Sequence, residues 1–141
     1  FIVLGIILFC FKRTRKMGAA VLLSLAAGGL IGNVVLKNLV MRDRPCWIDE
    51  SVRLLIQNPK DFSFPSGHTL ACFETAVSIF LYNRKWGVPV IVLASVIALS
   101  RLYLFVHFPT DVLSGMALGI FIGWYVHRTI EKYNFRGILR L

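Results

Sequence analysis

Two cations, Lys37 and Arg44, are the first side chains in this sequence that could do chemistry, and a proline follows the second. Their seven-residue spacing equals two helical turns, so both would face the same way if a helix continued to Pro45. Two fixed cations on one face could clamp an anion. Alternatively, Lys37 only extends its ammonium group from a helix end to water, and Arg44 is a solvated loop charge.

A second cluster, Pro65, Ser66, Gly67 and His68, leads directly into an apolar run that starts at Thr69. A helix that begins here would offer unpaired backbone N–H groups and a serine hydroxyl, and the glycine would let an anion approach the backbone closely. A phosphate group would fit such a site. The alternative is an ordinary serine helix cap followed by a histidine without a function.

The third cluster consists of Ser100, Arg101, His107 and Asp111, with Pro109 suited to the first turn of a final helix. The four-residue step lets Asp111 reach one ring nitrogen of His107, which would make the other nitrogen a better nucleophile. Arg101 ends a run of fifteen uncharged residues, where an ionised group usually faces a polar cavity. A purely structural His–Asp pair is the alternative.

Long apolar runs would have to position these clusters. Of the 141 residues, 57% are hydrophobic and 16% are charged, whereas a soluble domain averages about 25% charged residues. Residues 17–40 are long enough to cross a hydrocarbon layer of about 30 Å, and the runs at 68–83, 86–105 and 110–128 could each cross with tolerable flanking residues. The sequence therefore predicts an all-α integral membrane bundle forming a single domain, residues 1–141.

The remaining segments are a short apolar run and one long polar loop. Residues 1–11 are too few to span a bilayer, and we interpret them as the end of a truncated helix whose upstream part is missing. A signal peptide is the competing interpretation, but here the charges follow the apolar stretch and no cleavage pattern comes after it. Residues 41–67 are predicted to form the loop. Three cysteines without paired spacing predict neither a disulfide framework nor a thiolate zinc site.

Positive charge is concentrated on one side of this layout. A formal charge of +9 would suggest nucleic acid as the partner of a soluble protein. If every helix crosses, however, segments 12–16, 84–85 and 128–140 share one side and hold ten cations against one acid. This is the positive-inside distribution, so we expect a membrane partner and no nucleic acid. It places the loop and residues 101–111 outside the cytoplasm.

Together the three clusters resemble the three-part signature of the type 2 phosphatidic acid phosphatase superfamily. The positions that match in identity, order and internal spacing are Lys37, Arg44, Pro45, Pro65, Ser66, Gly67, His68, Ser100, Arg101, His107 and Asp111. One cluster alone would be a weak signal, whereas the whole set is specific. The resemblance covers about residues 18–128 and implies a six-helix membrane bundle of which five helices are present in this sequence.

The resemblance also implies a reaction. His107 would attack phosphorus to form a phosphohistidine, Asp111 would orient it, and His68 would protonate the leaving oxygen. The equatorial oxygens would be held by Lys37, Arg44, Ser66, Gly67 and Arg101. The implied function is hydrolysis of a lipid phosphate or lipid pyrophosphate without a metal or other cofactor. The enzyme would lie in a bacterial plasma membrane and release phosphate on the side that faces away from the cytoplasm.

The signature leaves the substrate and the acceptor open. Undecaprenyl pyrophosphate, phosphatidylglycerol phosphate and phosphatidate are all candidates. A lipid phosphotransferase would use the same site but pass the phosphate to an acceptor. A lipid-binding bundle without activity would have a degenerate site, which the intact signature disfavours. Soluble acid phosphatases and vanadium haloperoxidases share the signature, but their chains are not built from spanning helices.

Two features outside the signature concern packing. Glycines 115, 119 and 123 recur at four-residue steps and predict close packing of the last helix against a neighbour. Glu74 interrupts the apolar run after His68 and is predicted to make a hydrogen bond inside the bundle, with a role in proton supply as the alternative.

Overall fold

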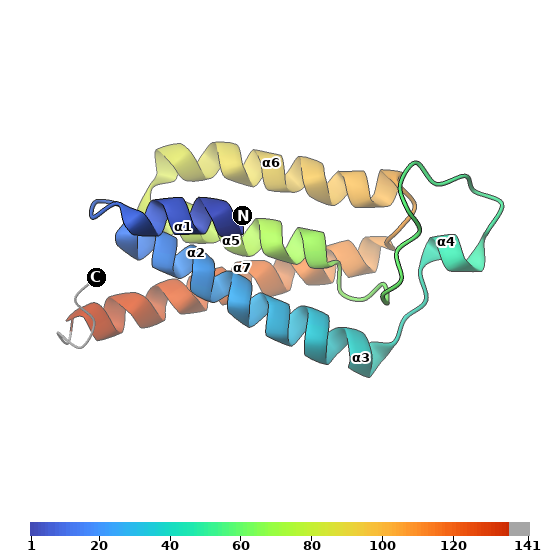
Figure 1. Ribbon diagram of the computed structural model, residues 1–141, viewed down its shortest axis with the longest axis horizontal. Helices are drawn as coiled ribbons and strands as arrows, with labels where there is room; N and C mark the ends of the chain where they lie inside the picture. Colours follow the sequence, from blue (N-terminus) through green and yellow to red (C-terminus); the bar gives the residue numbers. More distant parts are fainter. Residues whose placement is uncertain (136–141) are drawn as a thin grey trace.

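The computed structural model describes residues 1–135, which form an elongated bundle of helices (Figure 1). Helix α1 (Ile2–Cys10) turns back into one continuous helical stretch made of α2 (Arg15–Gly28), the π-helical segment η1 (Gly29–Leu36) and α3 (Lys37–Val40). The prediction of an all-helical chain is confirmed for the described part. The last residues of the basic segment predicted at 128–140 lie outside it.

The second half of the chain supplies three more long helices. They are α5 (Gly67–Tyr82), α6 (Arg84–Tyr103) and α7 (Pro109–Phe135). Counted with α1 and the continuous stretch through α3, the described residues contain five long helices. The segment predicted as a loop also holds a single helical turn, α4 (Pro45–Ile48), whose proline occupies the first helical position.

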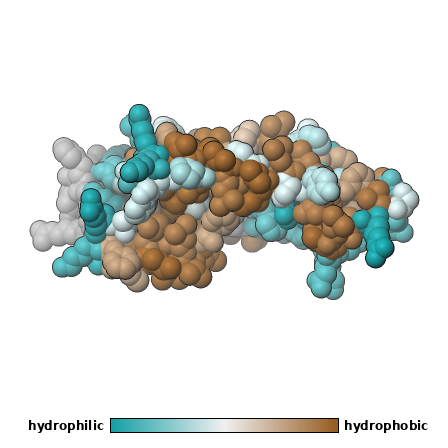
Figure 2. Space-filling view, turned by 90° about the horizontal axis from the view of Figure 1, so that it is seen from above, coloured by the Kyte–Doolittle hydropathy of each residue, from teal (hydrophilic) through white to brown (hydrophobic). Residues whose placement is uncertain are grey.

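Helix lengths and surface composition agree with a membrane environment. Two segments of the described chain hold a helix that is long and apolar enough to cross a bilayer: Arg15–Ile48, whose continuous helix ends at Val40, and Arg84–Tyr103. Large apolar side chains such as Val34, Leu99 and Phe121 are exposed on the outside of the bundle. Figure 2 shows hydrophobic side chains along the helices and the strongly hydrophilic ones toward the two ends. An apolar surface of this extent favours contact with lipid.

Helix α5 is the centre of the bundle and packs against α2, α6 and α7. The glycine stripe of α7 explains the closest of these contacts. A Cβ atom added at Gly115 would lie 2.7 Å from the backbone oxygen of Ser66, and one at Gly119 would lie 2.7 Å from that of Leu70. Because no side chain fits there, α7 lies directly on the backbone of α5, as the stripe predicts. The start of α5 is thereby fixed next to the start of α7.

Glu74 of α5 is buried within the bundle, with 1% of the residue exposed. Gly28 of α2 makes room for it, since a Cβ atom at that glycine would lie 2.0 Å from the Oε2 atom. Within residues 1–135, Oε2 has no hydrogen-bond partner. The hydrogen bond predicted for this side chain is therefore not made by that oxygen.

Candidate active site

The two ends of the long loop come together at one end of the bundle. The Ser63 amide donates to the Arg42 carbonyl over 2.8 Å, and Arg44 Nε donates to the Asp61 carbonyl over 2.7 Å. Segments 42–44 and 61–63 therefore lie side by side. They bring the side chains of Arg42, Arg44 and Ser63 against the turn between α6 and α7.

The helix that carries Lys37 ends before it reaches Arg44. The two cations therefore do not share one face of a continuous helix, which the sequence interpretation had made the condition for their convergence. Met41 adopts a left-handed conformation with φ of 47°, and its amide donates to the Lys37 carbonyl over 3.0 Å, which closes α3 at Val40. Arg44 is extended, with φ of −81° and ψ of 151°. The two cations still converge, because the carboxylate of Asp61 contacts both of them.

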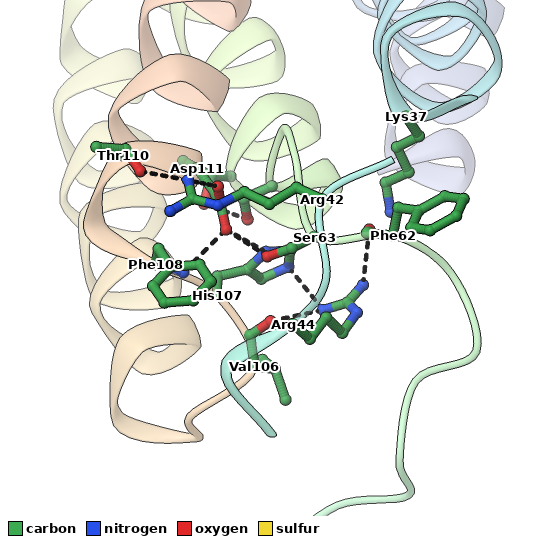
Figure 3. A network of polar contacts seen from close by, with 12 residues as sticks. Lys37, Arg42, Arg44, Phe62, Ser63, Val106, His107, Phe108, Thr110 and Asp111 are labelled. Atoms are coloured by element: carbon green, nitrogen blue, oxygen red, sulfur yellow. Dashed lines mark hydrogen bonds and ion pairs between the residues drawn. The ribbon is translucent and has the colours of Figure 1, made fainter. Parts of the chain in front are cut away.

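His107 lies in the turn between α6 and α7 and is 5% exposed. The left-handed residue Phe105, with φ of 57°, redirects the chain after α6. Arg44 Nη1 donates to the Val106 carbonyl over 2.8 Å and lies 3.2 Å from His107 Nε2 (Figure 3). A guanidinium group has only donors, so Nε2 must be the acceptor and the ring proton resides on Nδ1.

Ser63 and Asp111 hold the other side of the imidazole ring. His107 Nδ1 lies 3.4 Å from Ser63 Oγ and 3.6 Å from Asp111 Oδ2. The Ser63 hydroxyl donates to Asp111 Oδ2, so its oxygen can accept from Nδ1–H. Asp111 thus reaches His107 as the four-residue step predicts, and a serine that the sequence interpretation left out lies between them.

Asp111 is completely buried, and every contact of its carboxylate is with a donor. The Phe108 amide donates to Oδ2 over 2.9 Å. Arg42 Nη1 donates to Oδ1 over 2.8 Å and to Thr110 Oγ1 over 2.6 Å, while its guanidinium carbon lies 4.1 Å from the centre of the Phe108 ring. Figure 3 shows Arg42 reaching across to Thr110 and Asp111. The carboxylate is therefore fixed by an ion pair and two further hydrogen bonds.

His107 lines a cavity of about 400 Å³ together with Arg44, whose Nη1 lies next to Nε2. Six of the eight predicted site residues line it: Lys37, Arg44, Gly67, His68, Arg101 and His107. The other two do not. Asp111 lies behind the imidazole ring, and the buried hydroxyl of Ser66 is bonded to Thr69 Oγ1 over 2.9 Å. Ser66 is the residue directly before α5.

Arg101 has no acidic partner in the described part of the chain. Its guanidinium donates to Ser100 Oγ from Nε over 3.2 Å and from Nη2 over 3.1 Å, and it is half-buried at the cavity wall. A charge in this position favours an anion within the cavity as its partner.

Electrostatics prepare His107 as a nucleophile. Burial lowers the pKa of His107 and the charges of Arg44 and Lys37 lower it further, against the opposing effect of Asp111. The ring is therefore neutral near pH 7, with the lone pair of Nε2 next to the cavity. Burial by itself would raise the pKa of Asp61, but the hydrogen bonds and charges of Lys37 and Arg44 outweigh it and lower this pKa.

Sequence interpretation missed three residues of this site, namely Arg42, Asp61 and Ser63. Arg42 and Asp111 are 69 positions apart, so no local spacing links them. Ser63 lies just before the Pro65 cluster, and Asp61 is an acid near it, which was a usable signal. Only the pairing of the two loop ends makes them neighbours of His107.

Comparison with known proteins finds relatives over most of the chain. Residues 17–135 match the family described as the PAP2 superfamily. An undecaprenyl-diphosphatase of Sulfolobus acidocaldarius is 36% identical over 119 residues, which make up 84% of this chain and 57% of that protein. Phosphatidylglycerophosphatase B of Bacillus subtilis is 34% identical over 142 residues, covering 93% of this chain and 66% of that protein. The chain thus spans little more than half of the archaeal relative.

Two solved structures share the fold. The crystal structure of a transmembrane PAP2 type phosphatidylglycerolphosphate phosphatase from Bacillus subtilis has a TM-score of 0.70 and 33% identity, covering 93% of this chain and 67% of the other. The crystal structure of Aquifex aeolicus LpxE has a TM-score of 0.77 and 29% identity, covering 89% of this chain and 74% of the other. Likeness to a transmembrane protein supports the predicted membrane bundle.

Proposed function

The chain belongs to the PAP2 superfamily, and on that premise we propose that it hydrolyses a phosphomonoester or diphosphate on a membrane lipid through a phosphohistidine at His107. One observation carries the proposal. The buried His107 ring lines a cavity together with three cations, one of which, Arg44, lies next to Nε2, while Ser63 and Asp111 lie next to Nδ1. A neutral nucleophile facing an anion site is the arrangement that phosphoryl transfer needs.

In the first step, Nε2 of His107 attacks phosphorus and the bond from phosphorus to the lipid oxygen breaks. His68 lies at the start of α5, is exposed and lines the same cavity, so in its protonated form it can donate a proton to the leaving oxygen and become neutral. The modified ring carries positive charge, which the buried Asp111 carboxylate stabilises from the Nδ1 side. Lys37, Arg44 and Arg101 would neutralise the oxygens of the transferred group.

In the second step, water attacks the phosphohistidine. His68, now neutral, takes a proton from the water, the bond between phosphorus and Nε2 breaks, and inorganic phosphate leaves. His107 recovers its lone pair, and Arg44 again lies next to Nε2. Three cations and the backbone at the start of α5 would provide the charge stabilisation, so we expect the reaction to need no metal ion.

The names of the two relatives suggest the substrate class. One is an undecaprenyl-diphosphatase and the other a phosphatidylglycerophosphatase, and both names specify a phosphate group carried by a lipid. The exposed apolar surface of the helices supports a lipid substrate here. The charge distribution supports a site that opens outside the cytoplasm. A lipid phosphotransferase with the same phosphohistidine is the second candidate, since attack by an acceptor would replace attack by water.

The decisive experiment is release of inorganic phosphate from a panel of lipid phosphates and diphosphates in detergent, with a chelator present. We expect metal-independent hydrolysis that vanadate inhibits, and a loss of about two or more orders of magnitude in His107→Ala and in His68→Ala. His127→Ala is the matched control, because that ring packs on Tyr82 within the bundle and does not line the cavity. Full activity in His107→Ala would refute the proposal, and phosphate recovered on a second lipid would favour the phosphotransferase.

Orientation is tested separately by cysteine labelling. In a variant lacking the exposed Cys10, Ser51→Cys in the long loop should react from outside the cell, and Lys85→Cys at the start of α6 should react only from the cytoplasm. Both parent residues are exposed. The reverse labelling pattern would show that the proposed orientation is wrong.

A further inference from the structure

Asp61 holds the position at which a bound phosphate would be expected. Its Oδ1 atom accepts from Arg44 Nη2 over 2.8 Å, and its Oδ2 atom accepts from Lys37 Nζ. These are two of the three cations that line the cavity, and Asp61 lines it as well. A carboxylate presents two oxygens on one atom to the pair, as a phosphate group would.

We propose that Asp61 is a built-in competitor for the phosphate group, so that its carboxylate must leave Lys37 and Arg44 before substrate binds and returns when inorganic phosphate departs. The inference rests on the phosphate site of the proposed function. It assigns to Asp61 control over how tightly substrate and product are held. The residue sets affinity and takes no part in bond making or breaking.

Burial differs sharply between the carboxylate and its two partners. The Asp61 side chain is 58% exposed, whereas those of Lys37 and Arg44 are 8% and 4% exposed. A carboxylate next to open water regains its hydration when it moves out, so an exposed ion pair is held only weakly. The buried cations would stay behind and would need another anion. Exchange of carboxylate for phosphate satisfies both requirements.

Arg44 keeps its position without the carboxylate. Its Nε donates to the Asp61 backbone carbonyl, and its Nη1 donates over 2.8 Å to the carbonyl of Val106. Both anchors belong to the backbone and remain when the side chain of Asp61 turns away. Lys37 is part of α3, so its backbone is fixed by the helix. The cation pair is therefore ready for phosphate as soon as the carboxylate has moved.

The low pKa of Asp61 keeps the competitor charged at neutral pH. Competition would consequently persist over the whole range in which His107 is a neutral nucleophile. The carboxylate also makes the net positive charge of the cavity smaller by one than it would be without Asp61. This should limit the affinity for product phosphate and speed its release.

Asp61→Asn tests the proposal, because it removes the charge and keeps the size of the side chain. Equilibrium binding of inorganic phosphate and of vanadate is measured on purified protein in detergent, next to the KM for a lipid phosphate. We expect both anions to bind at least about fivefold more tightly and KM to fall. Asp49→Asn is the control, since Asp49 lies in the same loop, is fully exposed, and its carboxylate accepts hydrogen bonds from the nearby Ser51.

Unchanged or weaker anion binding in Asp61→Asn would overturn the inference and would make Asp61 an organiser of the cation pair. Should that variant fail to fold, Asp61→Ser gives the same comparison. Binding needs no turnover, so the two proposals fail separately. Tighter binding in a protein that hydrolyses no lipid phosphate would refute only the hydrolase. Unaltered binding in a protein whose activity depends on His107 would refute only the competitor.

Discussion

The two sides of the His107 ring each have an aspartate that is paired with an arginine, and the two pairs differ in which partner is buried. Behind the ring, Asp111 is completely buried, and the side chain of its partner Arg42 is 37% exposed. On the cavity side, the Asp61 side chain is 58% exposed, and its partner Arg44 is 4% exposed. The carboxylate is therefore enclosed behind the ring, on the closed side, and open to water on the cavity side, the open side.

Burial decides which contact lasts through a catalytic cycle. A buried carboxylate such as that of Asp111 is left uncompensated when its partner is removed, and for a fully buried pair this costs about 3–5 kcal/mol. An exposed carboxylate such as that of Asp61 can exchange its partner for water, and pairs between exposed groups contribute about 0–1 kcal/mol. Asp111 is therefore a fixed part of the site, and Asp61 is exchangeable. The closed side sets the tautomer of His107, and the open side admits phosphate.

The largest effect is expected when the closed side is broken at its centre, in Asp111→Asn. The amide keeps the shape but cannot balance the positive charge of a modified His107, and it can favour the wrong tautomer. We expect kcat to fall by about two to four orders of magnitude with a small change in KM. The control is Asp49→Asn, measured by steady-state phosphate release. A kcat within a factor of about three of the parent would show that Asp111 does not orient the ring.

Arg42→Gln weakens the support of Asp111 on the same side of the His107 ring. It leaves Oδ1 of Asp111 without its ionic partner and removes the guanidinium stacked on Phe108. We expect kcat to fall about tenfold to a hundredfold while KM stays constant, because Arg42 does not line the cavity. Arg53→Gln, at an exposed position of the loop, is the control. A rise in KM instead would mean that Arg42 binds substrate.

A smaller effect is expected for Ser63→Ala, which removes the hydroxyl between His107 and Asp111. The carboxylate keeps Arg42 and the Phe108 amide, and it lies 3.6 Å from Nδ1, so the ring loses only part of its support. We expect a decrease in kcat of about threefold to tenfold. Ser51→Ala, which removes an exposed hydroxyl that donates to Asp49 in the loop, provides the comparison. A loss as large as that of Asp111→Asn would mean that Ser63 is the true orienting group.

The sequence was sufficient to predict the helices, because long apolar runs have few alternatives to helical structure in a membrane. It also predicted that the three clusters meet, and six of their residues line one cavity. One condition stated for the first cluster could also have been judged from the sequence. A residue before proline is driven to an extended backbone, so Pro45 already excluded a helix through Arg44.

The loop contacts could not be predicted in the same way. Arg42, Asp61 and Ser63 act through contacts between segments 42–44 and 61–63 and with the turn after α6, and no periodicity encodes such pairings. Ser66 shows the converse limit. Its position in the signature predicted a bond to phosphate, whereas the hydroxyl bonds to Thr69 one helical turn later. Side-chain direction at a helix start depends on which neighbour offers a partner, and spacing alone does not decide it.

The smallest expected effect is on the pH profile, where the two sides of the ring act in opposite directions. Activity should fall as pH decreases through the pKa of His107, because a protonated ring has no lone pair, and this limb should lie below the ordinary value of 6.5. Arg44→Gln removes a charge that lowers this pKa, so the limb should move to higher pH. The value of kcat/KM is measured against pH for the parent, Arg44→Gln and the control Arg53→Gln. The same substrate is used throughout, so that its own ionisation affects all three profiles equally. A limb that does not move, or moves to lower pH, would mean that the cavity-side cation does not act on the nucleophile.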